Sequence, residues 1–241
     1  YQSNRASADE TVAAIEGALR IYVSILDEIL GDGEDLARAG REAGLRAIDR
    51  LDEIRRRVVV TALEALDDTP HDRIVTVSCS STVMAVLDGR SPPALLVGEG
   101  RPGLEGRTLA RRYADQGVDV QLCVDAALVG HMRPGDLVLV GADSVQADGA
   151  LVNKIGSLAM ALRARDLKVP FLAACETFKF SAKDEVPLED KEASEVWPEA
   201  PSSVAVSNFY FERVPASLVT AFVTDRGLLR YKEENWPVAE G

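Results

Sequence analysis

The sequence predicts an α/β protein in which an N-terminal helical bundle (residues 1–70) precedes a Rossmann-like, doubly wound parallel sheet (residues 71–241). Three observations support this prediction. Apolar residues recur at helical spacing over the first 70 residues, short β-rich runs begin after Asp72, and helical segments separate those runs. Alternation of strands with helices is typical of βαβ units in a parallel sheet.

Two apolar stripes with a period near 3.6 residues predict the N-terminal helices. Ser7 and Asp9 are candidate N-caps of the first helix, and Gly31-Asp32-Gly33 should end it. The stripes consist of Val12, Ile15, Leu19, Tyr22, Ile25, Leu26 and Ile29, followed by Leu36, Ala39, Ala43, Leu45, Ile48, Leu51, Ile54 and Val58. We expect two or three antiparallel helices that bury both stripes and serve packing or oligomer contacts.

The strands expected after residue 72 are mostly apolar on both faces, as in a parallel sheet covered by helices. They are Ile74–Val77, Ala94–Gly98, Val118–Val124, Leu137–Val140, Val169–Ala174, Val204–Val206 and Ala221–Val223. The helices expected between them are Ser81–Leu87, Glu105–Gln116, Ala126–His131, Lys154–Arg165 and Ala216–Leu218. The acidic, proline-containing stretch from Ser181 to Pro201 is predicted to be a long surface loop.

The composition argues against several classes of function. The net charge of −12 argues against direct binding of nucleic acid or anionic membranes. No apolar run approaches the ~18 residues of a membrane span, and no signal-peptide pattern opens the chain. Three scattered cysteines (Cys79, Cys123, Cys175) suggest neither a disulfide framework nor a metal cluster, so we expect a cytoplasmic protein without a metal.

The basic residues are 21 arginines and only six lysines, against 39 carboxylates. An acidic surface with few lysines suggests adaptation to high salt, where the Debye length falls to ~3 Å and carboxylate repulsion is screened. A GC-rich genome that prefers arginine codons is the alternative explanation. The sequence alone does not separate the two.

In a doubly wound sheet, ligands bind outside the carboxyl ends of the strands. Ser78, Ser80 and Ser81 follow the first predicted strand and open a helix, so their hydroxyls could cradle a phosphate. At such a position the pKa of Cys79 would be depressed. Ordinary N-capping by Ser80 or Ser81 beside a buried Cys79 is an equally good interpretation.

Further candidate ligand-binding residues follow the second, fourth and fifth predicted strands. Arg101 and Arg107 flank a glycine-rich loop and suit bidentate phosphate binding. Asp143 could exchange a proton with a sugar or grip a pair of hydroxyls. Asn153 and Lys154 at a predicted helix start, and Lys179, could hold an anion. Together these residues predict a phosphorylated, hydroxylated small molecule as the ligand, with no cofactor.

Four segments resemble a known family: GEGRPGLEGRTLA (98–110), VGADSVQADGALVNKIGSLAMAL (140–162), CETFKF (175–180) and VPASLVTAFVTDRG (214–227). They look like the alpha, beta and delta regulatory subunits of translation initiation factor 2B and equally like ribose-1,5-bisphosphate isomerase and methylthioribose-1-phosphate isomerase. The similarity covers about residues 45–235. It implies an N-terminal helical bundle, a Rossmann-like domain and a tendency to form homodimers or higher oligomers.

The resemblance also implies roles for particular residues. The isomerases use a Cys–Asp pair, and Asp143 matches their Asp, while Asn153 and Lys154 match substrate-contacting positions. Aligning Thr76 with the family Thr places Ser78 at the catalytic Cys position, so Cys79 falls one residue late. An Arg-Gly-Ala motif that contributes to the phosphate site of the isomerases has no counterpart near the amino end.

Three hypotheses follow. The first is an initiation-factor-2B-like regulatory protein that binds a phosphorylated sugar or a nucleoside monophosphate without full catalysis. The second is an aldose–ketose isomerase of a phosphorylated ribose, in which Cys79 moves a proton between carbons 1 and 2 and Asp143 is its acid–base partner. The third is a scaffold without a ligand.

Overall fold

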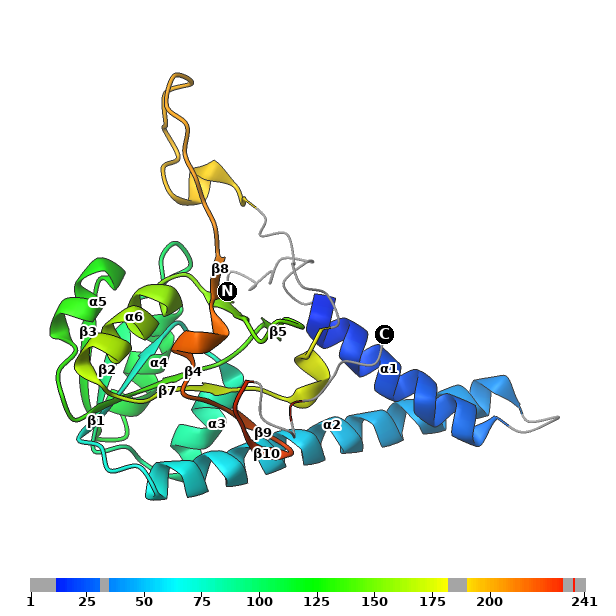
Figure 1. Cartoon of the computed structure of the whole chain (residues 1–241). Coiled ribbons are helices and arrows are strands. Elements are labelled where there is room, and N and C mark those ends of the chain that lie inside the picture. The colour runs from blue at the N-terminus through cyan, green and yellow to red at the C-terminus, as the bar shows by residue number, and fades with distance from the viewer. Residues whose placement is uncertain (1–11, 31–34, 182–189, 232–235, 237–241) are drawn as a thin grey trace.

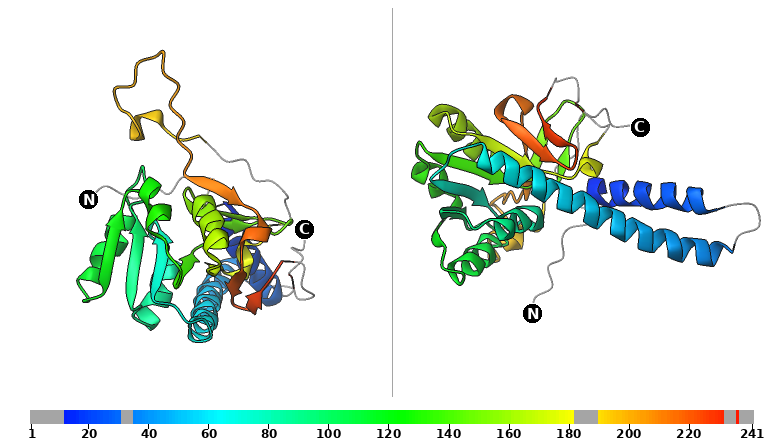
Figure 2. Two further views of the ribbon diagram at one scale, coloured as in Figure 1. Left: turned by 60° about the vertical axis from the view of Figure 1, so that its left-hand side comes forward. Right: turned by 90° about the horizontal axis from the view of Figure 1, so that it is seen from below.

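The computed structural model describes all residues except 1–11, 31–34, 182–189, 232–235 and 237–241. Two helices, α1 (Val12–Ile29) and α2 (Leu36–Asp67), pack antiparallel as a helical hairpin, and the N-terminal end of α2 lies far from the α/β body (Figure 1; Figure 2, right). Asp35 caps α2, since its side chain accepts a hydrogen bond from the backbone N–H of Ala37. The candidate caps Ser7 and Asp9 and the Gly31–Gly33 break lie outside the described residues.

The main sheet has seven strands in the order β10-β9-β7-β4-β1-β2-β3. All neighbours run parallel except β9 and β10, which pair antiparallel. The expected doubly wound α/β fold is therefore confirmed. The strands are β1 (Arg73–Val77), β2 (Ala94–Gly98), β3 (Asp119–Cys123), β4 (Asp136–Val140), β7 (Phe171–Ala174), β9 (Ala221–Thr224) and β10 (Gly227–Leu229).

Alternate residues of the buried strands enter separate cores on the two faces of the sheet, as a two-residue period requires. Val75 packs into the core on the side of α5 (Asp125–His131) and α6 (Ser157–Leu167). Ile74 packs into the opposite core with residues of α2, α3 (Ser81–Gly89) and α4 (Gly106–Ala114). The C-terminal half of α2 thus covers the sheet, while its N-terminal half projects beyond it (Figure 1).

A second, antiparallel sheet contains β5 (Ser144–Val145), β6 (Leu151–Lys154) and β8 (Phe211–Val214). This sheet was not predicted from the sequence. Lys154 therefore lies in a strand and not at the start of a helix, which begins only at Ser157. The left-handed Gly156 (φ 103°) makes the turn between them, and glycine adopts this conformation at little cost.

Other expectations also need correction. Residues 204–206 are not a strand; they belong to an extended arm, residues 190–209, that projects from the body above β8 (Figure 1; Figure 2, left). Ala216–Leu218 is a short 3-10 turn. Two further 3-10 turns are η1 (Thr177–Lys179) and η2 (Ala193–Glu195).

The helical hairpin buries only part of the predicted stripes. Ala39, Ala43 and Val58 are buried, but Leu19 and Leu45 are 54% and 68% exposed. The expectation that the helices bury both stripes is therefore wrong for the outward positions, because α1 packs on one face only, against α2 and η1. Among the described residues, no helix combines the length and apolar character needed to cross a membrane.

Candidate functional site

The predicted site residues gather at the carboxyl edge of the parallel sheet, where polar segments follow β1, β2, β4 and β7. β1 and β4 are neighbours, so the segments that follow them meet. A Cβ on Gly141, after β4, would lie only 2.3 Å from Oγ of Ser80, after β1. The absence of a side chain at Gly141 therefore lets the two segments pack together.

The segment after β1 turns sharply at Ser78, whose φ of 65° is unusual for a residue with a side chain. Ser80 caps α3, since its Oγ accepts a hydrogen bond from the backbone N–H of Val83 at 3.3 Å. The N-capping interpretation is thus confirmed for Ser80, and Ser81 is the exposed first residue of α3. β1 ends at Val77, so the one-residue offset between Ser78 and Cys79 falls at a turn and not on an extended strand.

Cys79 is half-buried, and its Sγ lies 3.5 Å from Sδ of Met84. Burial raises the pKa of the Cys79 thiol above its ordinary value, and the Glu105 carboxylate raises it further, while Arg112 opposes them. The expectation of a depressed pKa is therefore wrong. A position just before a helix would lower the pKa of a thiol, but burial and the nearby Glu105 carboxylate outweigh this effect. Cys79 is therefore protonated at neutral pH.

The glycine-rich loop after β2 is held by Asp125, the residue that opens α5. The Asp125 carboxylate accepts hydrogen bonds from the backbone N–H groups of Gly100 (2.8 Å) and Arg101 (2.7 Å). The Arg101 guanidinium donates to the carbonyl of Val196 in the arm at 3.3 Å. Arg107 is more than half exposed and pairs with Glu99 at 2.8 Å.

Lys154 is buried at the end of β6 and is enclosed by two groups. Its Nζ lies 3.2 Å from the Glu105 carboxylate and 4.5 Å from the centre of the Tyr210 ring. Oε2 of Glu105 is also buried and has no hydrogen-bond partner within the described residues. The Lys154 charge is thus balanced inside the protein.

The expected anion site at the start of α6 is occupied by a side chain of the protein itself. The Glu212 carboxylate accepts hydrogen bonds from the backbone N–H groups of Gly156 (2.6 Å) and Leu158 (2.8 Å). Asn153 donates to Oγ of Ser157 at 2.8 Å and is buried. A carboxylate at the positive end of the helix satisfies the free N–H groups that an external anion would otherwise bind.

Lys179 connects the segments that follow β4 and β7. Its Nζ donates to the carbonyl of Ala142 at 3.1 Å and pairs with Glu176 at 2.8 Å. Glu176 in turn accepts a hydrogen bond from Oγ1 of Thr82 at 2.9 Å. Burial alone would raise the pKa of Glu176, but the Lys179 ammonium and the hydrogen bonds outweigh it and hold this pKa below its ordinary value.

Asp143 lies on the same side as this pair. Its negative charge contributes to the raised pKa of Lys179, for which burial acts in the opposite direction and Glu176 dominates the increase. Asp143 also raises the pKa of Cys175, although burial of that thiol is the larger cause. The backbone N–H of Asp143 donates to the carbonyl of Val152 at 3.0 Å, which fixes the start of the β5–β6 hairpin.

The structure therefore arranges the predicted residues in two groups. In the first group, Glu105 raises the pKa of Cys79 and pairs with Lys154. Asp143 is grouped with Lys179 and the buried Cys175. The two groups are joined where the Ser80 side chain approaches the backbone at Gly141.

Sequence reasoning missed the acidic residues that organise this edge. They are Glu105, Asp125, Glu176, Glu212 and Asp225. Asp225 holds η1 by accepting hydrogen bonds from the backbone N–H and Oγ1 of Thr177, at 2.7 and 2.9 Å. Asp125 and Asp225 could have been found from the sequence, because each stands just after a predicted strand. Glu212 could not, because the strand that carries it, β8, was not predicted.

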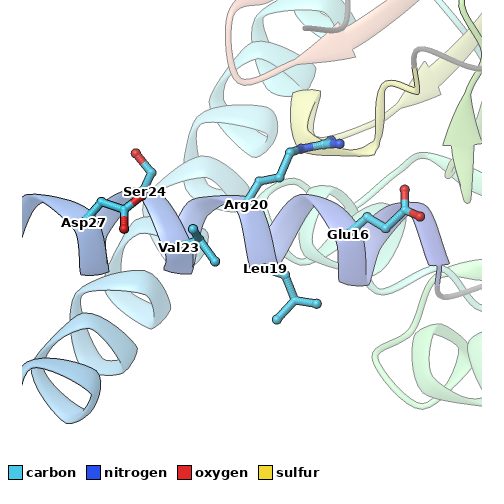
Figure 3. A pocket seen from close by; sticks show the side chains of 6 residues that line it. All are labelled: Glu16, Leu19, Arg20, Val23, Ser24 and Asp27. Carbon is cyan, nitrogen blue, oxygen red and sulfur yellow. The ribbon is translucent and has the colours of Figure 1, made fainter. Parts of the chain in front are cut away.

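An open hollow lies elsewhere, along the exposed face of α1 (Figure 3). None of the predicted site residues lines it. The lining residues are Glu16, Leu19, Arg20, Val23, Ser24 and Asp27. Within the described parts of the chain, no cluster of His, Cys, Asp and Glu has the arrangement of a metal site.

Comparison with known proteins gives a consistent result. Residues 6–231 match the Initiation factor 2 subunit family. Ribose 1,5-bisphosphate isomerase of Methanocaldococcus jannaschii is 32% identical over 203 residues, which are 76% of this chain and 65% of that protein. Methylthioribose-1-phosphate isomerase of Pelotomaculum thermopropionicum is 36% identical over 163 residues, which are 61% of this chain and 44% of that protein.

Two solved structures share the fold. Translation initiation factor eIF-2B of Pyrococcus horikoshii OT3 has a TM-score of 0.72 at 22% identity, over 94% of this chain and 84% of that one. The 5-methylthioribose 1-phosphate isomerase of the same organism has a TM-score of 0.72 at 26% identity, over 90% of this chain and 67% of that one. This chain thus spans about half to two thirds of the length of the two isomerases matched in sequence. With the fold, the strand-end segments and the family match in agreement, the chain belongs to the Initiation factor 2 subunit family, which includes relatives of both isomerases.

Proposed function

We propose that this protein is an aldose–ketose isomerase of a phosphorylated ribose, with its site at the carboxyl edge of the parallel sheet. The observation that carries the proposal is the placement of Cys79 and Asp143 after the neighbouring strands β1 and β4. The contact between Ser80 and Gly141 holds the two segments together. The names of the similar isomerases support the same substrate class.

In this proposal, Cys79 carries the proton from carbon 2 to carbon 1 of the sugar. Asp143 exchanges protons with the oxygens, so that the 2-hydroxyl becomes a ketone while the ring oxygen gains a proton on opening. The overall composition of the sugar does not change. Because its pKa is raised, Cys79 is a thiol at neutral pH, and it must first release this proton to solvent before the thiolate can act as a base.

The remaining groups would bind the substrate. Oε2 of Glu105 is buried without a hydrogen-bond partner in the described structure, so it could accept a hydrogen bond from a sugar hydroxyl. Ser78, Ser81, Arg101 and Arg107 would then supply donors to phosphate. Lys154 and Lys179 would attract the phosphate less strongly than free lysines, because Glu105 and Glu176 partly neutralise their charges.

Phosphorus NMR with ribose 1,5-bisphosphate tests this proposal. We expect new resonances from the ribulose product with the wild-type protein, and none with Cys79→Ser or Asp143→Asn. Cys123→Ser is a matched control and should keep its turnover. An unchanged spectrum with the wild-type protein would overturn the assignment for this substrate, and the same assay with methylthioribose 1-phosphate then decides whether the isomerase assignment fails altogether.

A second candidate is a binding protein without turnover, of the initiation-factor-2B regulatory type. Two observations favour it: Sγ of Cys79 contacts Met84, and Lys154 is already neutralised by Glu105. In this case a sugar phosphate or a nucleoside monophosphate raises the melting temperature by mass action, without new resonances. Asp143→Asn should reduce that shift, and the absence of a shift with both ligand classes would contradict this candidate.

A further inference from the structure

Tyr210 covers the buried Lys154 of the candidate site. It stands where the arm leads into β8 (Figure 1). The centre of its ring lies 4.5 Å from Nζ of Lys154, a distance at which the face of an aromatic ring attracts an ammonium group. Lys154 is only 4% exposed, so Tyr210 and Glu105 together enclose its charge. The proposed isomerisation uses no atom of Tyr210, so the position of this ring needs its own explanation.

Hydrogen bonds at both ends of Tyr210 fix its position. The backbone N–H of Ile155, the residue after Lys154, donates to the carbonyl of Tyr210 at 2.8 Å. The Tyr210 hydroxyl donates to Oε2 of Glu195 at 2.6 Å, and the amide of the buried Asn208 donates to the same oxygen at 2.8 Å. Moving the ring away from Lys154 therefore requires breaking the hydrogen bond to Glu195.

The Glu105 carboxylate beside Lys154 has one oxygen that a ligand could use. Oε1 pairs with Lys154, while Oε2 is buried and accepts no hydrogen bond from the described residues. A Cβ on Gly100 would lie 2.9 Å from Oε2 and 3.4 Å from Cα of Ser78, so this oxygen lies where the loop after β2 meets the turn after β1. A buried carboxylate oxygen without a donor is costly, and the position therefore favours a ligand that brings a hydrogen-bond donor.

The chemistry of the Lys154–Glu105 pair suits a sugar hydroxyl better than a phosphate. A hydroxyl oxygen can accept a hydrogen bond from the Lys154 ammonium and donate its own proton to Oε2 of Glu105. One small, neutral group thus meets both needs while the ring of Tyr210 stays in place. A phosphate is larger, is repelled by the Glu105 carboxylate, and reaches Lys154 only when the ring of Tyr210 moves aside.

We propose that Tyr210 is a specificity-determining residue, which makes Lys154 and Glu105 bind a hydroxyl of the sugar and keeps phosphate away from them. Glu195 acts through the Tyr210 hydroxyl and is a positioning residue. The phosphate of the ligand then binds to the two arginines that flank the glycine-rich loop. This role rests on the ligand class of the proposed function, a phosphorylated sugar, but it does not require turnover.

Isothermal titration calorimetry with two probes, inorganic phosphate and ribose 5-phosphate, tests the role of Tyr210. The measure of specificity is the Kd for phosphate divided by the Kd for ribose 5-phosphate. In Tyr210→Leu, phosphate reaches Lys154 without displacing a ring, so we expect tighter phosphate binding and a ratio that falls about fivefold. A purely structural role would weaken both probes alike and leave the ratio unchanged. Tyr22→Leu is the matched control, because the Tyr22 hydroxyl on α1 contacts the carbonyl of Gly40 in α2.

The same ratio tests whether Glu195 acts through Tyr210. Tyr210→Phe keeps the ring and removes the hydroxyl, while Glu195→Ala removes the acceptor of that hydroxyl. Each should lower the ratio about twofold, and the double variant should match the single ones because all of them lose the same hydrogen bond. Additive effects would overturn the positioning role of Glu195. Circular dichroism establishes that each variant is folded, and Tyr210→Phe decides the proposal if Tyr210→Leu does not fold.

The outcomes separate this role from the isomerase assignment. An unchanged or higher ratio in Tyr210→Leu overturns the role of Tyr210, even where phosphorus NMR shows the ribulose product. A ratio that falls because ribose 5-phosphate binds more weakly, or that falls equally in Tyr22→Leu, also overturns it. If the ratio falls as expected and no product forms, the isomerase assignment fails and Tyr210 selects the ligand of a binding protein. Wild-type protein that binds neither probe overturns the role together with the proposed ligand class.

Discussion

The carboxylate of Glu105 lies 3.2 Å from the ammonium nitrogen of Lys154, and the same carboxylate acts on the half-buried Cys79. One acidic residue thus offsets the charge of Lys154 and, together with burial, raises the pKa of the Cys79 thiol. Glu105 was not among the residues that sequence analysis singled out. It belongs to the start of α4, where the chain returns from the glycine-rich loop.

Replacing this carboxylate should strengthen anion binding. In Glu105→Gln, the Lys154 side chain loses its carboxylate partner, so we expect inorganic phosphate to bind about tenfold more tightly, which is ~1.4 kcal/mol. Isothermal titration calorimetry at low ionic strength measures this change. Glu53→Gln on α2 is the control, because the exposed Glu53–Arg57 pair includes none of the candidate site residues and its loss should change affinity by less than about twofold. Equal affinities of wild type and Glu105→Gln would show that Lys154 does not reach the ligand.

The reactivity of Cys79 should depend on pH in a definite direction. Because its pKa is raised above the ordinary 9.0, the thiolate fraction is small at pH 7.5 and grows as pH increases beyond 9. Iodoacetamide labelling followed by peptide mass spectrometry should therefore show slow modification at pH 7.5 and a steep increase at alkaline pH.

The same experiment tests the role of Glu105. Glu105→Gln should accelerate labelling of Cys79 and leave that of Cys123 unchanged, because Asp125 and not Glu105 is the main acidic neighbour of Cys123. Cys175 should resist labelling in both proteins, since it is fully buried. Rapid labelling of Cys79 at neutral pH would contradict the raised pKa.

Removing the charge of Lys179 should destabilise the fold. Glu176 has a side chain that is only 3% exposed, so Lys179→Met leaves a buried carboxylate without its cation. We expect a loss of ~3–5 kcal/mol of unfolding free energy at pH 7, measured by urea denaturation. Lys179→Met combined with Glu176→Gln should recover part of this loss.

The pH dependence of that loss has a predicted sign. In the wild type the folded pKa of Glu176 is below 4.5, so its contribution to stability is present above about pH 4.5 and is lost as pH falls through the folded value. In Lys179→Met, burial would raise the folded pKa, and the deficit should shrink when unfolding is measured at acidic pH. A deficit that stays constant between pH 7 and pH 4 would argue that lost packing, and not an unpaired charge, causes it.

Two glycines inside the helical hairpin should respond to alanine in opposite directions. A Cβ on Gly17 would lie 2.2 Å from the carbonyl oxygen of Phe178, so Gly17→Ala should push α1 away from η1 and lower stability by ~1–3 kcal/mol. Nothing lies within 4 Å of a Cβ on Gly44, so Gly44→Ala should stabilise α2 by ~0.5–1 kcal/mol. Thermal unfolding of both variants measures the contrast, and destabilisation by Gly44→Ala would mean that α2 has a neighbour in solution at that position.

Local patterns were enough to predict most of the main sheet. β1, β2, β4 and β7 are continuous apolar runs that two helical layers bury, and such runs are visible without tertiary information. The same reasoning failed for residues 204–206, where two valines of high β-propensity lie in an exposed arm. A strand requires a partner strand as well as propensity.

The sequence by itself determined the fold class, the order of the main strands along the chain, and the edge of the main sheet that Asp143 and Lys179 follow. These features follow from periodicity and from the rule that parallel strands end at one side of a sheet. Only the tertiary structure decided which charges pair. Lys154 meets Glu105 from 49 residues away, and Glu212 reaches the start of α6 from 54 residues beyond Leu158. Such pairings depend on how segments distant in the sequence pack together. A buried charge is costly unless it is paired, and only the packing decides which opposite charge lies close enough to pair with it.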